Sequence, residues 1–204
     1  MATGGVFFPF EAEARATGHQ VIIGLDEAGR GPLAGPVVAA AVWLPEEATI
    51  PGLQDSKRLT ARQRDTVYQC IQQRALAYSI GMVSHTQIDR HNILWATLEA
   101  MLRALRRLPT APDLLLIDGN TGLAIPIPQR LIVRGDACCT SIAAASVVAK
   151  VTRDRLMAAY SKRYPVYGFD KHKGYPTREH YACLQTYGPC PIHRRSFRGV
   201  VTVP

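Results

Sequence analysis

The chain has 204 residues, 47% of them hydrophobic, and its 24 Lys and Arg against 16 Asp and Glu give a net charge of +8. These values indicate an ordinary globular protein of one domain, with or without an appended lobe, that needs no disulfide or metal staples. The longest uncharged stretch, residues 31–45, is too short for a membrane span, and the N-terminus lacks a signal-peptide pattern. We therefore expect a cytoplasmic protein without membrane contact.

The apolar pattern switches between continuous runs and helical spacing, which predicts a mixed α/β domain. In chain order we expect strands over 21–25 and 37–44, a helix over 61–77, a strand over 78–83, a helix over 87–107, strands over 114–117 and 131–133, a helix over 141–160, and a helix that begins at Thr177. The helix over 141–160 is apolar all round in its first half, so we expect it to be the most buried helix.

Three predicted strands run into acidic residues: Asp26 and Glu27 after the first, Asp118 after the fourth and Asp136 after the fifth. One acid at a strand end is usually a turn residue or a helix cap. Three such ends together favour a functional site, because an ionised carboxylate beside a buried sheet needs a compensating charge. Oxygen-only clusters suit hard divalent cations such as Mg²⁺.

A further acid, Asp154, lies within the helix over 141–160, and its alternative role is an ion pair with Lys150 one turn earlier. The turn 28–32 is rich in glycine and lets the backbone approach a ligand closely, although a simple hairpin turn would look the same. The five cysteines include no Cys-x-x-Cys pair, which argues against a structural zinc site. For the adjacent Cys138 and Cys139 we favour packing over a redox role.

Nearly all the excess positive charge lies in the last 54 residues, which hold ten basic residues and three acids interleaved with Tyr and Phe. Cations beside aromatic rings suit a polyanion with stackable sugars and bases, whereas the alternative is a basic surface that aids solubility. Basic surface beside metal-binding acids indicates phosphodiester hydrolysis, in which two ions activate a water and stabilise the leaving oxygen.

Residues 26–38, Asp-Glu-Ala-Gly-Arg-Gly-Pro-Leu-Ala-Gly-Pro-Val-Val, strongly resemble the signature of the ribonuclease HII family. Further matches follow in order and extend the resemblance over about residues 20–198: Asp55-Ser-Lys57, Ile117-Asp-Gly119, Gly135-Asp136, residues 141–154, Tyr167-Gly-Phe169, His172-Lys-Gly-Tyr-Pro-Thr177 and His193-Arg-Arg-Ser-Phe197. The resemblance implies a ribonuclease H-like mixed β-sheet flanked by helices, with a helical basic C-terminal lobe. We expect an N-terminal extension over 1–19, a catalytic core over 20–164 and the lobe over 165–204, in one compact domain.

The resemblance also implies a metal-dependent endoribonuclease. Such enzymes hydrolyse the RNA strand of RNA/DNA hybrids and nick duplex DNA 5′ of embedded ribonucleotides, as in ribonucleotide excision repair, and leave 3′-hydroxyl and 5′-phosphate ends. It implies Mg²⁺ or Mn²⁺ as cofactor, with two ions per active site during turnover. By motif, Asp26, Glu27 and Asp118 match catalytic metal-binding acids, Asp154 best matches the fourth, and Asp136 is an outer candidate.

The same motifs imply the substrate contacts. Gly29, Arg30 and Gly31 match the element that reads the 2′-hydroxyl, and Tyr175 matches the tyrosine that stacks on the sugar at the RNA-to-DNA junction, with packing in the lobe as its alternative. The expected phosphate contacts are Lys57, Lys173, Arg194 and Arg195.

The chain departs from the family pattern after Gly135-Asp136, where Ala137-Cys138-Cys139 replace the usual basic residue, so one phosphate contact is expected to be missing. Two other functions stay open: another nuclease of this fold, such as a junction resolvase, and a hybrid-binding module without turnover. The C-terminal tail holds no evident partner-binding peptide, and nothing in the sequence requires more than a monomer.

Overall fold

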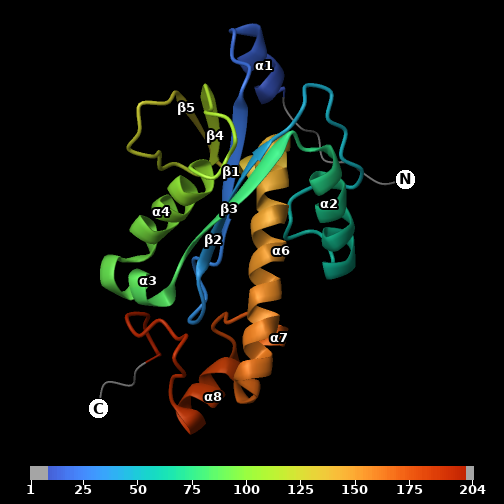
Figure 1. Cartoon of the computed structure of the whole chain (residues 1–204). Coiled ribbons are helices and arrows are strands. Elements are labelled where there is room, and N and C mark those ends of the chain that lie inside the picture. Colours follow the sequence, from blue (N-terminus) through green and yellow to red (C-terminus); the bar gives the residue numbers. More distant parts are fainter. Residues whose placement is uncertain (1–8, 201–204) are drawn as a thin grey trace.

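A computed structural model describes residues 9–200 of the chain. A single five-stranded sheet lies between two layers of helices, and the long helix α6 extends beyond the sheet to a C-terminal lobe (Figure 1). The strands are β1 (Ile22–Ala28), β2 (Val37–Trp43), β3 (Ala77–Val83), β4 (Leu114–Asp118) and β5 (Gln129–Ile132). Their order is β3-β2-β1-β4-β5, with β2 antiparallel to both neighbours and β4 parallel to both of its own. The predicted mixed sheet flanked by helices is therefore confirmed.

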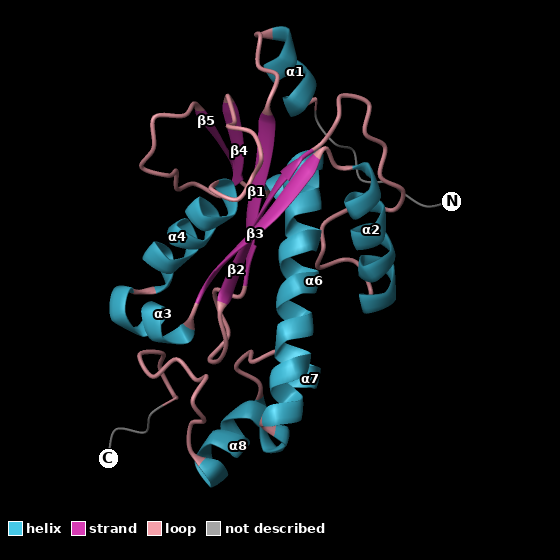
Figure 2. Cartoon of the chain, in the orientation of Figure 1, coloured by secondary structure: helices cyan, strands magenta, loops and turns pink. Residues whose placement is uncertain are grey.

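The helices occupy both faces of this sheet and the lobe (Figure 2). Their bounds are α1 (Phe10–Ala16), α2 (Ala61–Arg74), α3 (His85–His91), α4 (Ile93–Leu105), α5 (Gly135–Cys138), α6 (Thr140–Arg163), the 3₁₀ turn η1 (Pro165–Tyr167), α7 (Phe169–His172) and α8 (Arg178–Tyr187). Helices α2 and α6 cover one face of the sheet, and α3 and α4 cover the other. Residues 1–8 of the extension expected over 1–19, and residues 201–204 at the end of the lobe, lie outside the described residues.

The helix predicted over 87–107 is two helices. Asn92 separates them with a φ of 83°, a left-handed conformation that no α-helix continues through. Its side-chain oxygen accepts a hydrogen bond from the Trp95 amide at 3.0 Å and so caps α4. The helix predicted to end at residue 77 also ends earlier, at Arg74, because Ala75 is already extended towards β3.

Helix α6 packs directly on the sheet, as its run of small residues predicts. The side chains of residues 142–145 are completely buried, and a Cβ at Gly24 of β1 would overlap the backbone of Ser141. Backbone contact of this kind requires glycine on the strand and small residues on the helix. The prediction that this is the most buried helix is confirmed.

Helix α1 caps the start of α6, a contact that the sequence does not reveal. The Glu11 carboxylate accepts a hydrogen bond from the Ser141 amide at 2.7 Å, where an acid is favoured by the helix dipole. The thiol of Cys139 also points at this carboxylate, at 3.2 Å. Burial, reinforced by the charge of Glu11, raises the pKa of the Cys139 thiol, so it stays protonated and unreactive. The packing role preferred for this cysteine is thus supported.

The lobe has buried histidines, which predict a loss of stability in acid. Burial, with the neighbouring His180, His85 and His172, lowers the pKa of His193 from 6.5 to about 4. The unfolded chain therefore binds the extra proton first, and this contribution to stability is complete above pH 6.5 and lost as pH falls through 6.5 towards 4. We expect up to about 1.4 kcal/mol of unfolding free energy to be lost per pH unit in that window. Urea unfolding of the protein and of His193→Gln should give the variant the flatter pH dependence; equal slopes would contradict the assignment.

Candidate active site

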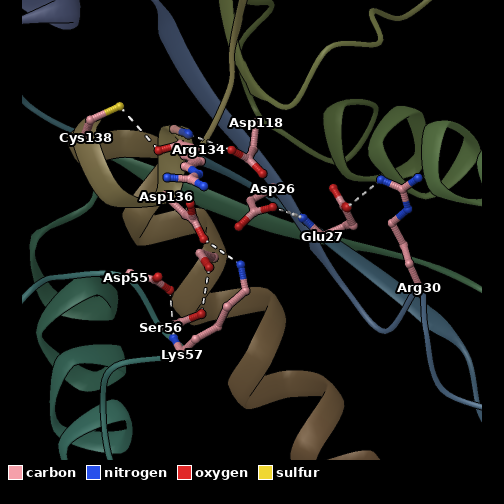
Figure 3. A network of polar contacts seen from close by, with 12 residues as sticks. Asp26, Glu27, Arg30, Asp55, Ser56, Lys57, Asp118, Arg134, Asp136 and Cys138 are labelled. Carbon is pink, nitrogen blue, oxygen red and sulfur yellow. Dashed lines mark hydrogen bonds and ion pairs between the residues drawn. The ribbon is translucent and has the colours of Figure 1, made fainter. Parts of the chain in front are cut away.

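Two of the predicted acids meet because β1 and β4 are parallel neighbours. The register pairs Leu25 with Ile117, so Asp26 and Asp118 occupy the next position on adjacent strands. Figure 3 shows their carboxylates turned towards each other where β4 ends beside the last residues of β1. The strand-end pattern in the sequence therefore becomes one cluster in the fold.

Asp26 and Glu27 approach this cluster from opposite faces of the sheet, because successive strand residues alternate. Asp26 is 4% exposed and lies on the α6 side, where it lines the same pocket as Ser146 of α6. Its Oδ1 also accepts from the Glu27 amide at 2.6 Å. The Glu27 carboxylate is turned to the other side and pairs with Arg30 at 3.3 Å.

Burial and mutual repulsion disfavour the ionised form of these acids. Burial is the largest cause that raises the pKa of Asp26 well above its usual 3.8, and the charges of Glu27 and Asp118 add to it. Burial likewise raises the pKa of Glu27 and of Asp118. Their basic and amide partners lower these pKa values, but each stays above its usual value. A group of oxygen ligands whose negative charge is only partly compensated suits a hard divalent cation.

The structure adds Asp136 to this cluster and leaves Asp154 outside it. Asp118 accepts a hydrogen bond from the Gly135 amide at 2.7 Å, and the charge of Asp136 contributes to its raised pKa. Asp154, the expected fourth acid, pairs instead with Lys150 at 2.8 Å, the ion pair that was its alternative role. It lines a separate hollow with Arg64, Asp65, Arg155 and Lys173.

Two basic side chains pair with carboxylates of the cluster. Lys57 lies 2.8 Å from Asp136, and this hydrogen bond raises the pKa of Lys57 to about 12, while Arg30 holds Glu27 (Figure 3). Within residues 9–200, no three His, Cys, Asp or Glu side chains are arranged to hold a metal ion. The acids fit a divalent ion by charge and atom type.

A pocket of about 200 Å³ opens over the acids. Its lining brings together Asp26, Glu27, Asp118, residues 28–31, Ser56, Lys57, Ser146, Lys150 and Tyr175. The half-exposed ring of Tyr175 faces the glycine turn, since a Cβ at Gly31 would lie 3.7 Å from its Cε1. The predicted turn and the predicted stacking tyrosine thus form one wall beside the acids.

Arg194 does not lie where a phosphate contact is expected. It is 0% exposed, and its guanidinium donates to the carbonyls of Gly29 at 2.6 Å and of Arg30 and Gly35 at 2.9 Å. An arginine with its donors used in this way has no surface to offer a phosphate. The structure corrects the expectation, because Arg194 holds the glycine turn from beneath.

A second buried arginine, Arg153, was missed by sequence analysis. It donates to the carbonyls of Ala34, Pro36 and Lys173, each at 3.0 Å, and so ties the loop after β1 to the lobe. Arg153 also explains why position 29 is a glycine. Gly29 has a φ of 99°, and a Cβ there would overlap the Arg153 side chain. Its only sequence signal was a charge within an apolar helix.

The remaining expected phosphate contacts are spread over the surface. Lys57 lies in the pocket, Lys173 bonds through Nζ to the Asp170 carbonyl beside the Asp154 hollow, and the Arg195 amide bonds to Asp89 of α3 at 2.9 Å.

In the part of the chain that the structure describes, no helix is long and apolar enough to cross a membrane.

The family model and a curated relative identify one family, and solved structures show the same fold. The family model described as Ribonuclease HII matches residues 23–200. A curated relative from Geobacter sulfurreducens named Ribonuclease HII is 54% identical over 191 residues, which cover 94% of this chain and 88% of the relative. Among solved structures, ribonuclease H2 from Pyrococcus horikoshii OT3 is similar with a TM-score of 0.78 and 27% identity, over 89% of this chain and 95% of that one. The fold of Bst-RNase HIII in complex with Mn²⁺ is also similar, with a TM-score of 0.64 and 17% identity over 95% and 72% of the two chains.

Proposed function

The chain belongs to the ribonuclease HII family, and from this premise we propose that it nicks duplex DNA 5′ of embedded ribonucleotides, as well as cleaving hybrids, by a two-metal mechanism. Family membership itself makes the protein a nuclease that cleaves the RNA strand of RNA/DNA hybrids, with the metal dependence general to the family. The observation that carries the proposal is the pocket, where mutually repelling acids lie beside a glycine turn and an aromatic ring.

We assign Asp26, Glu27, Asp118 and Asp136 as the metal ligands. Mg²⁺ and Mn²⁺ both take carboxylate oxygens, and the Mn²⁺ in the Bst-RNase HIII structure is consistent with this choice. When bound, two such ions activate a water and stabilise the leaving oxygen, which requires no protein nucleophile. Lys57 and Arg30 pair with Asp136 and Glu27, and they would be free to contact phosphates once bound ions neutralised these carboxylates.

The protein's own part is to position the substrate. Among the described residues, the amides of Arg30 and Gly31 have no protein acceptor, whereas Arg194 fixes the carbonyls of the turn. These amides can therefore bind the 2′-hydroxyl, the group that distinguishes RNA from DNA. The ring of Tyr175 then stacks on the next sugar, and the basic lobe, which we place at 165–204 beside a core at 20–164, binds the backbone.

The choice between Asp136 and Asp154 as the fourth ligand predicts opposite outcomes for two isosteric variants. We expect Asp136→Asn to lower the initial rate at saturating Mg²⁺ by about 100-fold or more, since it removes a metal ligand. Asp154→Asn loses only its pair with Lys150 and should stay within about threefold of the wild-type rate. The reverse order would return the assignment to Asp154.

The function is tested with a labelled DNA duplex that contains one ribonucleotide, beside an all-DNA duplex, an all-DNA junction and a long RNA/DNA hybrid. We expect a nick only 5′ of the ribonucleotide, with 3′-hydroxyl and 5′-phosphate ends, in Mg²⁺ or Mn²⁺ but not in a chelator. Cleavage of the all-DNA substrates would favour a resolvase-like nuclease. Binding without cleavage in either ion would favour a hybrid-binding module.

A further inference from the structure

Three histidines that the proposed chemistry does not use form a cluster beneath Tyr175. His180 and His193 are buried, at 0% and 1% exposure, and the rings of His172 and His180 stack with centroids 4.5 Å apart. The ring of Phe169 fills the space between all three histidines. The residues come from α7, α8 and the segment after α8, so the cluster joins three parts of the lobe.

The hydrogen bonds of two histidines determine where their protons lie. A carbonyl oxygen only accepts, so Nδ1 of His180 donates to the carbonyl of Tyr175 at 3.0 Å. In a neutral His180 the Nε2 atom is then an acceptor, and Nε2 of His193, 2.9 Å away, is its donor. This leaves Nδ1 of His193 to accept from the Cys190 amide at 2.9 Å. The chain of bonds runs in one direction, from Cys190 to Tyr175.

His172 completes the set by the same reasoning. Its Nδ1 accepts from the Gly174 amide at 3.1 Å, and its Nε2 donates to the Tyr167 carbonyl at 2.7 Å. The amide of Gly174 and the carbonyl of Tyr175 are thus both held by histidines. A proton added to His180 would bring two N–H groups face to face in a buried site, so this arrangement requires neutral rings.

The segment held in this way is also packed against the glycine-turn loop. Gly174 has a φ of 84°, a Cβ on it would lie 2.9 Å from the carbonyl oxygen of Ala34, and its own carbonyl accepts from the Leu33 amide at 2.8 Å. The backbone of Tyr175 is therefore held on one side by the loop that lines the pocket and on the other by the histidines. Beyond this backbone, the ring of Tyr175 lies beside Gly31 of the glycine turn and near the cations Lys150 and Arg153, 5.9 Å and 6.0 Å from its centroid.

We propose that His172, His180 and His193 are positioning residues that lock the Gly174–Tyr175 backbone and thereby set selectivity for a single ribonucleotide over a long hybrid. The proposal rests on the junction-stacking role proposed for Tyr175. A long hybrid offers many cleavable positions and tolerates a displaced ring, whereas a single ribonucleotide offers one junction and does not. The hydrogen-bonded histidines act on selectivity through Tyr175 and touch no reacting atom.

The test compares kcat/KM for a duplex with one ribonucleotide with kcat/KM for a long hybrid, and uses their ratio. We expect His180→Leu and Tyr175→Ala each to lower the ratio about tenfold, the scale of one lost stacking contact. His180→Asn keeps an amide donor near the Nδ1 position and should keep the ratio near that of the wild type. Leu184→Ala, a truncation of a buried residue one turn further along α8, is the matched control for lost packing and should leave the ratio unchanged.

The possible results separate this proposal from the proposed function. If Tyr175→Ala lowers the ratio and His180→Leu does not, the positioning role is overturned while the stacking role stands. If Leu184→Ala lowers the ratio as much as His180→Leu, the effect is general loosening of the lobe, and the proposal is also overturned. A wild-type protein that nicks neither substrate would refute the proposed function itself.

A measurement that needs no variant tests the hydrogen-bond direction. Long-range ¹H–¹⁵N correlation spectra of the imidazole rings at neutral pH distinguish the two neutral tautomers from the doubly protonated ring. We expect His180 as the Nδ1–H tautomer, and His172 and His193 as Nε2–H tautomers. Any other protonation of His180 would be incompatible with its hydrogen bonds to Tyr175 and His193 and would overturn the proposal.

Discussion

Asp118→Asn is expected to lower the rate of hybrid cleavage by about 10³-fold or more, while substrate affinity in a chelator stays within about threefold. The substitution keeps the shape of the side chain and an oxygen that can accept from the Gly135 amide, but it removes the charge that a divalent ion requires. The cations around the pocket are untouched. Single-turnover rates and fluorescence anisotropy measure the two effects, and Asp65→Asn, at an exposed ion pair with Arg155, is the control that should change neither.

The same variant should be more stable than the wild type when no metal is present. Burial and the charge of Asp136 raise the folded-state pKa of Asp118, so ionising it opposes folding, and this penalty grows as pH rises above the unfolded value of 3.8. Asparagine carries no such penalty. We expect a Tm gain of a few degrees in a chelator at neutral pH, which added Mg²⁺ should reduce by stabilising the wild type. An active variant, or one less stable in chelator than the wild type, would contradict the assignment of Asp118.

Arg194→Met is expected to cost about 3 kcal/mol or more of unfolding free energy, or roughly 6–12 °C in Tm. Methionine fills similar space but leaves three backbone carbonyls, those of Gly29, Arg30 and Gly35, without their donor. Lysine should not rescue the loss, because one ammonium cannot reproduce the planar fork.

The neighbouring residue provides the control for this prediction. The side chain of Arg195 is exposed, so Arg195→Met should change stability by no more than about 0.5 kcal/mol. Urea unfolding of both variants gives the comparison. If Arg194 instead contacted phosphates, Arg194→Met would keep its Tm and weaken binding with a shallower salt dependence.

The sequence predicted the sheet and the acidic residues at the ends of its strands because both depend on local patterns. Apolar runs locate β1 and β4, and their parallel pairing then brings Asp26 and Asp118 together without further information. The break at Asn92 was missed because apolar spacing continues on both sides of it, and only its backbone conformation ends the helix. Helix periodicity reports the buried face and not the continuity of the hydrogen bonds.

Contacts between distant residues could not be predicted in this way. Arg194 looked like a phosphate ligand because charge is visible in a sequence, whereas burial under a loop 165 residues earlier is not. The Glu11 cap of α6 depends on a contact of the same kind. Asp136 ranked below Asp154 because motif similarity carries no distances, and the fold then placed Asp136 beside Asp118 and turned Asp154 towards Lys150.

Helix α6 also fixes the spacing between the acids and the Tyr175 segment. Ser146 on this helix lines the pocket beside Asp26, and Arg153, two turns or about 10 Å further along, donates a hydrogen bond to the carbonyl of Lys173 next to the Tyr175 segment. Because both contacts are made by one unbroken helix, the proposed function implies a fixed offset between the sugar on which the Tyr175 ring stacks and the phosphate that lies beside the acids. The position of the nick should therefore stay one fixed step from the junction, whatever bases flank it and whichever ion is bound.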